Sequence, residues 1–338
     1  MDLQTFLTDW HNDNPRLLVH TSGSTGQPKP LWVEKRRMEA SARMTCAFLG
    51  LQPGDSALLC LPLDYIAGKM MVVRSEVGGL KLTTVDPTGH PLAGLSPQEK
   101  PFALVAMVPL QVYNTLQVPE ETALLRQVRH LIIGGGAVDD ALADALKDFP
   151  NAVWSTYGMT ETLSHIALRR LSGPQANPWY EPFDGVSLSL SADGCLVISA
   201  PHVCADVLTT NDRAEIHSDG RRFRILGRRD NVVCSGGLKI QIEEVEQMLR
   251  RHTDVPFLVT RCPDPRLGEA LVLLAETTDT EGLKALCTTV LPKYWQPRYC
   301  MTVKRLPLTE TGKPARSEAQ VLALSLVSST GKPVNKHR

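Results

Sequence analysis

The sequence predicts an α/β protein, and three observations support this fold class. Short apolar runs alternate with helical patterns, and glycine, proline or charged residues bound each run; the runs are 58–61, 102–108 and 130–133. Such runs are typical of buried strands in a helix-covered sheet. Within the stretch 186–201 apolar and polar residues alternate up to Ser191, and Asp193-Gly194 predicts the turn of a hairpin. The length of 338 residues is long for one hydrophobic core, so two domains are expected.

The chain after a further predicted strand, 222–226, has its own set of elements. Val245, Met248 and Leu249 have the spacing of an amphipathic helix, and the basic residues 250–252 suit its C-terminal end. Predicted elements follow in the order strand, helix, strand, at 269–276, 281–291 and 298–307. We therefore predict a large domain over 1–227 and a small α+β domain over 228–338, with a tail that frays from about Ser325.

The composition favours a small ligand over a macromolecule. The chain has 36 basic and 36 acidic residues, so charge gives no argument for binding nucleic acid or an anionic membrane surface. Its eight cysteines form no CxxC pair, which argues against a disulfide framework or a zinc site. There is neither a signal-peptide pattern nor a window of roughly 20 apolar residues that would span a membrane. We expect a soluble cytoplasmic protein.

Five polar segments carry the candidate chemistry. The loop 21–29 combines glycines, hydroxyls and a lysine, which suits phosphate, although it does not have the Walker A spacing. Segment 154–161, WSTYGMTE, ends in a hydroxyl beside a carboxylate, a pair that can hold phosphate and a hard divalent cation. Asp212 follows a strand and could accept ribose hydroxyls, 227–240 combines arginines with a Gly-Gly turn, and Lys313 lies in a glycine-containing turn.

Each segment alone also has an ordinary structural interpretation. The loop could be a surface turn, Glu161 a carboxylate at a helix start, Asp212 a turn former and Lys313 a surface lysine. Together and in this order, however, the segments resemble the adenylate-forming (AMP-binding) superfamily, which includes acyl-CoA synthetases, adenylation domains of peptide synthetases and luciferases. The resemblance extends from Thr21 to Lys313.

The resemblance implies an ATP-dependent acid:CoA ligase. Such an enzyme converts a carboxylate and MgATP to an acyl-adenylate and pyrophosphate, and then forms a CoA thioester and AMP. The implied fold is a large domain with a helix-covered mixed sheet and a small mobile α+β C-terminal domain. The implied cofactors are ATP and Mg²⁺, with coenzyme A as a co-substrate.

The resemblance also implies roles for individual residues. The β- and γ-phosphates would be bound by Thr21, Ser22, Gly23, Ser24, Thr25, Gly26 and Lys29. The adenine pocket would be formed by Gly134, Gly135, Gly136, Ser155, Thr156, Tyr157 and Gly158. Thr160 would contact the α-phosphate and Glu161 would help to hold Mg²⁺. Asp212 and Arg228 would bind the ribose, and Asp230 would be the hinge. Gly236 and Gly237 would bind CoA.

Lys313 is the predicted catalytic lysine. A carboxylate that attacks a triphosphate brings like charges together, so a cation that reaches both groups stabilises the transition state. Because Lys313 lies in the small domain and the phosphate loop in the large one, adenylation requires the two domains to close, and the family rotates the small domain for the thiol step.

The segment 61–79, LPLDYIAGKMMVVRSEVGG, narrows the choice of acid substrate. Tyr65 stands where many relatives have histidine, Gly68 is retained, and Arg74 follows four apolar residues. A buried arginine needs an anionic partner, although a surface or ion-paired arginine is the alternative. This stretch is most similar to short-form o-succinylbenzoate:CoA ligases of menaquinone biosynthesis. Their substrate is a dicarboxylate, and we predict that Arg74 anchors the carboxylate that does not react.

The sequence also departs from the family. Pro30 and Asn211 stand where relatives commonly have glycine, and the long segment that usually precedes the phosphate loop is nearly absent. We therefore expect a trimmed large domain with less sheet and a more open acid pocket, which a second subunit of a homodimer would complete. Two alternatives remain: an adenylating ligase for another aryl or acyl acid or for a carrier-protein thiol, and a nucleotide-binding homologue that does not catalyse.

Overall fold

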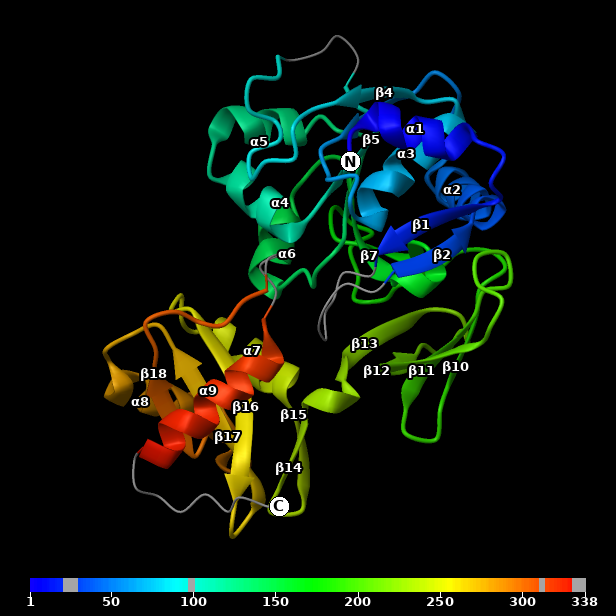
Figure 1. Cartoon of the computed structure of the whole chain (residues 1–338). Coiled ribbons are helices and arrows are strands. Elements are labelled where there is room, and N and C mark those ends of the chain that lie inside the picture. Colours follow the sequence, from blue (N-terminus) through cyan, green and yellow to red (C-terminus); the bar gives the residue numbers. More distant parts are fainter. Residues whose placement is uncertain (21–29, 97–100, 310–313, 330–338) are drawn as a thin grey trace. The chain divides into compact units, whose positions relative to one another are not determined.

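The computed structural model describes residues 1–20, 30–96, 101–309 and 314–329, which form two compact units (Figure 1). The first unit comprises Met1–Ser191, Leu196–Thr209 and Glu215–Arg224. The second comprises Ala192–Cys195, Thr210–Ala214 and the chain from Ile225 onward. Both contain sheets covered by helices, which confirms the α/β class. The division of function between domains 1–227 and 228–338 stays a prediction.

A seven-stranded sheet forms the centre of the first unit. Its strand order is β4-β3-β5-β6-β7-β8-β9. The strands are β3 (Ser56–Leu59), β4 (Lys81–Thr84), β5 (Leu104–Met107), β6 (His130–Ile133), β7 (Ala152–Gly158), β8 (His165–Arg170) and β9 (Glu181–Pro182). The pairs from β4 to β7 are parallel, and β8 and β9 run antiparallel to their neighbours. The three apolar runs therefore form β3, β5 and β6, as predicted, and the sheet is mixed.

Helices cover both faces of this sheet. On one face, α4 (Pro109–Leu116), α5 (Pro119–Leu125) and α6 (Asp140–Leu146) contribute Val112, Leu125 and Leu146 to a core shared with β3, β5, β6 and β7. On the other face, α2 (Lys35–Leu49) packs against α3 (Ile66–Gly78), and the ring of Phe48 lies edge-on to Trp154 of β7 at 5.6 Å. The unit begins with α1 (Leu3–His11) and the antiparallel pair β1 (Arg16–His20) and β2 (Pro30–Glu34).

A four-stranded sheet follows, with the order β10-β11-β12-β13. Its strands are β10 (Ser187–Leu190), β11 (Cys195–Ser199), β12 (Leu208–Ile216) and β13 (Phe223–Arg228). The first two are antiparallel, and Gly194 in their turn has a φ of +74°, a conformation that glycine adopts without a steric cost. The hairpin predicted at Asp193-Gly194 is thus confirmed.

The second unit is a five-stranded sheet between helices. The strands are β14 (Val232–Ser235), β15 (Leu238–Gln241), β16 (Phe257–Asp264), β17 (Gly268–Ala275) and β18 (Tyr299–Thr302). One face packs against α7 (Ile242–Arg250) and α8 (Thr280–Val290), and the other packs against α9 (Arg316–Ser329). The expected fraying from Ser325 is wrong up to Ser329, because Ala319, Ala323 and Val327 form an apolar stripe that α9 buries against the sheet.

Candidate active site

The glycines of the predicted adenine pocket lie at the carboxyl ends of β6 and β7. Ile133 pairs with Ser155, so residues 134–136 continue beside Thr156. A Cβ atom at Gly134 would lie 2.5 Å from the Thr156 hydroxyl oxygen, which excludes larger residues unless Thr156 moves. Gly135 has a φ of +78°. In open α/β sheets, ligands bind outside the carboxyl ends of the parallel strands, and the structure brings these predicted residues together there.

The end of β7 faces other aromatic residues. The buried Ser155 hydroxyl is 2.9 Å from the Tyr180 hydroxyl, and the ring of Tyr157 meets Phe223 edge-on at 5.1 Å. Tyr180 also stacks on Phe223 at 5.4 Å. These flat apolar groups suit a nucleobase, and the assignment of Ser155 to Gly158 to adenine stays a prediction.

The connection from β7 to β8 carries the predicted phosphate and metal residues. A single turn of 3₁₀ helix, Thr160–Thr162, places Thr160 in a buried position and leaves Glu161 exposed. Leu163 then has a φ of +66°, which is costly for a residue with a side chain. Its N–H donates to the Thr160 carbonyl at 2.9 Å, and its side chain is buried, so local contacts hold this conformation.

One exposed carboxylate fits the way in which proteins usually hold Mg²⁺. Within 1–20, 30–96, 101–309 and 314–329 no group of three or more His, Cys, Asp or Glu side chains could hold a metal ion. Mg²⁺ commonly uses one or two carboxylates together with water and substrate phosphates, and does not require a full protein cage. Glu161 would hold Mg²⁺ in this manner when nucleotide is bound, and the ion would neutralise developing negative charge on the phosphates.

The predicted ribose and hinge residues form one cluster in the second unit. Arg228 lies 3.8 Å from a carboxylate oxygen of Asp212 and 3.3 Å from one of Asp230. The side-chain amide of Asn211 donates to Asp230 at 3.3 Å, and Gln241 donates to the Arg228 carbonyl at 2.8 Å. The cluster unites three residues from two distant motifs, and their roles stay predictions.

The predicted CoA glycines form a tight turn. Gly236 and Gly237 connect β14 to β15, with φ values of +57° and +84°. Two successive residues with positive φ are typical of a two-residue hairpin turn, which favours glycine at both positions. The turn explains the glycines without a ligand, and the structure leaves their role toward CoA untested.

Two of the predicted acid-binding residues lie at the start of α3. Tyr65 is the half-buried residue before the helix. A Cβ atom at Gly68 would overlap the backbone carbonyl of Pro62, so glycine is required for α3 to approach the end of β3 this closely. Gly68 therefore has a packing role whether or not it contacts the acid.

Arg74 is fully buried near the end of β7. It is 2% exposed, and one terminal nitrogen, Nη2, donates to the Ser164 hydroxyl at 2.6 Å. The same nitrogen lies 3.5 Å from His165 Nδ1, while the other, Nη1, lies 3.9 Å from the sulfur of Met71. The Nε atom of Arg74 is buried and has no hydrogen-bond partner among the described residues. Burial lowers the pKa of Arg74 to about 10, which reflects an unfavourable environment for its charge.

Sequence reasoning missed the residues around Arg74. Ser164 and His165 follow the WSTYGMTE segment by three and four residues, and Thr45 of α2 contacts His165 at 3.1 Å. The sequence feature that could have identified them is the polar pair Ser164-His165, which directly precedes the apolar run 166–168 of β8.

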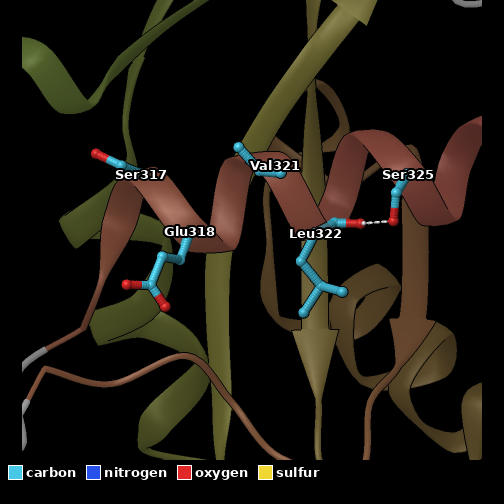
Figure 2. A pocket seen from close by; sticks show the side chains of 5 residues that line it. All are labelled: Ser317, Glu318, Val321, Leu322 and Ser325. Atoms are coloured by element: carbon cyan, nitrogen blue, oxygen red, sulfur yellow. Dashed lines mark hydrogen bonds between the residues drawn. The ribbon is translucent and has the colours of Figure 1, made fainter.

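Two predicted elements lie outside the described residues: the phosphate-binding residues Thr21 to Gly26 with Lys29, and Lys313. The structure does contain a pocket on α9, where Figure 2 shows the side chains of Ser317, Glu318, Val321, Leu322 and Ser325. All five belong to one helix, and the pocket contains none of the predicted site residues. We therefore place the candidate site at the carboxyl ends of β6 and β7.

The helices of the described chain also bear on the membrane prediction. None of them combines the length and the apolar character that a membrane crossing requires. The cytoplasmic location and the homodimer stay predictions.

Comparison with known proteins identifies two family models along the chain. The model described as "AMP-binding enzyme" matches residues 4–187, and the model described as "AMP-binding enzyme C-terminal domain" matches residues 244–313. An acyl-CoA synthetase (AMP-forming)/AMP-acid ligase II-like protein from Dyadobacter fermentans has a crystal structure that is 36% identical. The match covers 93% of this chain and 91% of that one, with a TM-score of 0.64.

Curated relatives and further structures point to the same class. The 2-succinylbenzoate–CoA ligase of Bacillus thuringiensis subsp. konkukian is 24% identical, over 90% of this chain and 69% of its own length. The fold is shared with o-succinylbenzoate CoA synthetase of Bacillus subtilis, solved with the intermediate OSB-AMP, at a TM-score of 0.75 and 22% identity; 89% of this chain and 68% of that chain are covered. These findings confirm the predicted superfamily, the fold and the class of ATP-dependent acid:CoA ligase.

Proposed function

This chain belongs to the AMP-binding enzyme family as an ATP-dependent acid:CoA ligase, and we propose that the acid it activates is o-succinylbenzoate. The single observation that carries the proposal is Arg74, a buried arginine with an unpartnered Nε atom beside the nucleotide motif. Such a group favours a ligand that brings a carboxylate in addition to the one that reacts.

The cation at Arg74 lacks an anionic partner within the described residues. Its contacts there are a serine hydroxyl, a histidine nitrogen and a methionine sulfur, and no ion pair involves it. Guanidinium groups bind carboxylates strongly because the hydrogen bonds are charge-assisted, and the unpartnered Nε–H of Arg74 is a donor that such a bond can use. The second carboxylate of o-succinylbenzoate would satisfy the group, and the curated relatives named for this acid support the choice.

The nucleotide would occupy the carboxyl ends of β6 and β7. We assign adenine to Gly134–Gly136 with Ser155–Gly158, the α-phosphate to Thr160 and Mg²⁺ to Glu161. Asp212 and Arg228 would hold the ribose, and the loop from Thr21 to Lys29 would hold the outer phosphates. ATP and magnesium are named for a related structure, which supports these cofactors.

Pyrophosphate release from ATP, measured with a panel of acids in the presence and absence of CoA, tests the proposal. We expect release with o-succinylbenzoate, and a thioester product only when CoA is present. Release with another aryl or acyl acid, and none with o-succinylbenzoate, would show that the proposed substrate is wrong and that the other acid is activated. If no acid gives release although ATP binds, the chain is a nucleotide-binding homologue without catalysis. If a thioester forms on a carrier protein and not on CoA, then CoA is not the acceptor and the enzyme is a ligase for a carrier-protein thiol.

Lys313→Ala tests the proposed catalytic lysine in the same assay. We expect adenylation to be abolished and ATP binding to be largely kept, because the lysine stabilises the transition state. Lys304→Ala, a change of another lysine in the same part of the chain, is the control. Turnover retained in Lys313→Ala would refute the role.

A further inference from the structure

The buried contacts of Arg74 continue into a chain of hydrogen bonds that crosses three elements. Arg74 Nη2 is 2.6 Å from the Ser164 hydroxyl, which is 3.3 Å from His165 Nδ1. His165 Nε2 is 3.1 Å from the Thr45 hydroxyl, which donates to the Ser41 carbonyl at 3.1 Å. The chain thus connects α3, the start of β8 and α2.

Elementary donor and acceptor rules fix the direction of every hydrogen bond. Arginine can only donate, so Ser164 and His165 Nδ1 are acceptors toward Arg74. Thr45 uses its proton toward the Ser41 carbonyl, so it accepts from His165 Nε2. The proton of His165 is therefore on Nε2, and Nδ1 presents a lone pair. All donors point the same way, from Arg74 through Ser164, His165 and Thr45 to the Ser41 carbonyl.

Burial is consistent with this neutral form of His165. The side chain is 7% exposed, and burial together with the nearby Arg74 charge holds its pKa well below the usual range. The unprotonated Nδ1 of a neutral ring can accept a hydrogen bond from the arginine, whereas a protonated ring would repel the arginine's charge.

We propose that Ser164 and His165 are positioning residues that hold the guanidinium of Arg74 by its Nη2 atom and leave its Nε–H free to donate to the second carboxylate of the acid substrate. The inference rests on the proposed function. A buried long side chain has several rotamers, and fixing it before the substrate arrives lowers the entropic cost of binding. Specificity for a dicarboxylate then depends on residues that do not contact it.

Two matched pairs of variants separate positioning from packing. Ser164→Ala removes the hydroxyl and Ser164→Thr keeps it. His165→Gln keeps a nitrogen near the Nε2 position toward Thr45, whereas His165→Asn keeps an acceptor near the Nδ1 position toward Arg74 and Ser164. We expect Ser164→Ala and His165→Gln to raise the KM for o-succinylbenzoate by about ten-fold or more, since each removes a hydrogen bond that involves a charged or polarised group. Ser164→Thr and His165→Asn should stay within about three-fold, and the KM for ATP should stay within about three-fold in all four.

Equal KM effects on acid and ATP, or equal effects of Gln and Asn at His165, would overturn the proposal. The tautomer gives a test that does not need activity. In the ¹⁵N-histidine NMR spectrum of the free protein at pH 7.5, the signal lost in His165→Asn should show a protonated Nε2 and an unprotonated Nδ1. The opposite tautomer, or a doubly protonated ring, would refute the network. If o-succinylbenzoate gives no turnover, the proposed function fails, and the tautomer still decides whether the network exists.

Discussion

Replacing Arg74 by methionine should weaken acid binding and stabilise the free protein at the same time. Methionine is long, unbranched and uncharged, so it occupies much of the same space beside Met71 and the start of β8. Arg74→Met therefore removes the charge while limiting the cavity that alanine would leave.

The stability gain follows from the burial of an unpaired cation. Burial lowers the pKa of Arg74 from 12.5 to about 10, a difference that corresponds to about 3 kcal/mol against the charged form. Loss of the hydrogen bond to Ser164 offsets part of this gain. We expect the free energy of unfolding in urea to rise by about 1 to 3 kcal/mol in the absence of substrate.

The binding loss is larger and specific to the acid. Removing one partner of a buried, hydrogen-bonded charge pair costs about 2 to 5 kcal/mol, which is about 30-fold to several thousand-fold in kcat/KM for o-succinylbenzoate. The KM for ATP should change by less than about three-fold, because the hydrogen-bond partners of Arg74 in the described part of the chain include none of the predicted nucleotide residues.

The assay compares o-succinylbenzoate with two analogues that each carry one carboxylate, 4-oxo-4-phenylbutanoate and 2-butanoylbenzoate, in the pyrophosphate-release reaction. An analogue can be activated only if it keeps the carboxylate that reacts. In the unmodified protein, the kcat/KM of that analogue should be lower than that of o-succinylbenzoate, and in Arg74→Met this difference should largely disappear. Arg43→Met, which changes an exposed arginine of α2, is the control. An unchanged preference for the dicarboxylate, equal losses for acid and ATP, or a less stable variant would refute the reasoning.

Three further predictions test other parts of the molecule. Gly68→Ala should lower the free energy of unfolding by about 1 to 3 kcal/mol, because the added Cβ overlaps the Pro62 carbonyl; unchanged thermal unfolding would show that the contact can relax. Asp212→Asn should raise the KM for ATP about ten-fold or more with little effect on the acid, whereas Asp193→Asn, a change of an exposed partner of Arg229, should not. Finally, stability should fall as the pH drops below about 6.5, by about 1.4 kcal/mol per pH unit for each of two histidines, the half-buried His130 and the buried His165, because the unfolded chain then binds protons that the folded chain does not. Burial lowers the pKa of His130 to about 4 and that of His165 well below its usual range, so urea unfolding that is equally stable at pH 7 and pH 5 would contradict this.

Local patterns predicted much of the fold. β3, β5 and β6 are buried on both faces, so their strands appear in the sequence as continuous apolar runs. The hairpin at Asp193-Gly194 appears as alternation around a turn dipeptide. The strand order β4-β3-β5 and the antiparallel addition of β8 depend on pairs far apart in the sequence, and no local pattern encodes them.

The site was predicted only where a motif marks it. The sequence left open whether Arg74 is buried, because helix α3 has no amphipathic pattern from which an exposed face could be identified. The structure explains this absence: all eight residues from Gly68 to Ser75 are buried, as in a helix that is covered all round. Ser164, His165 and Thr45 lie on separate elements or beyond the recognised motif, so their convergence on Arg74 follows from tertiary packing alone.

The connection from Gly158 to His165 unites the two halves of the candidate site. Its first part carries Thr160 and Glu161, the predicted phosphate and magnesium residues, and its last part carries the pair that contacts Arg74. A Cβ atom at Gly158 would overlap the Ser164 carbonyl, and the positive φ of Leu163 turns the chain between the two parts. A conformation of this kind costs about 1 to 3 kcal/mol and persists only where its surroundings enforce it. Because one short segment sets the geometry at both ends, nucleotide and acid would be bound in a fixed relation to each other, which is the condition that attack of the carboxylate on the α-phosphate requires.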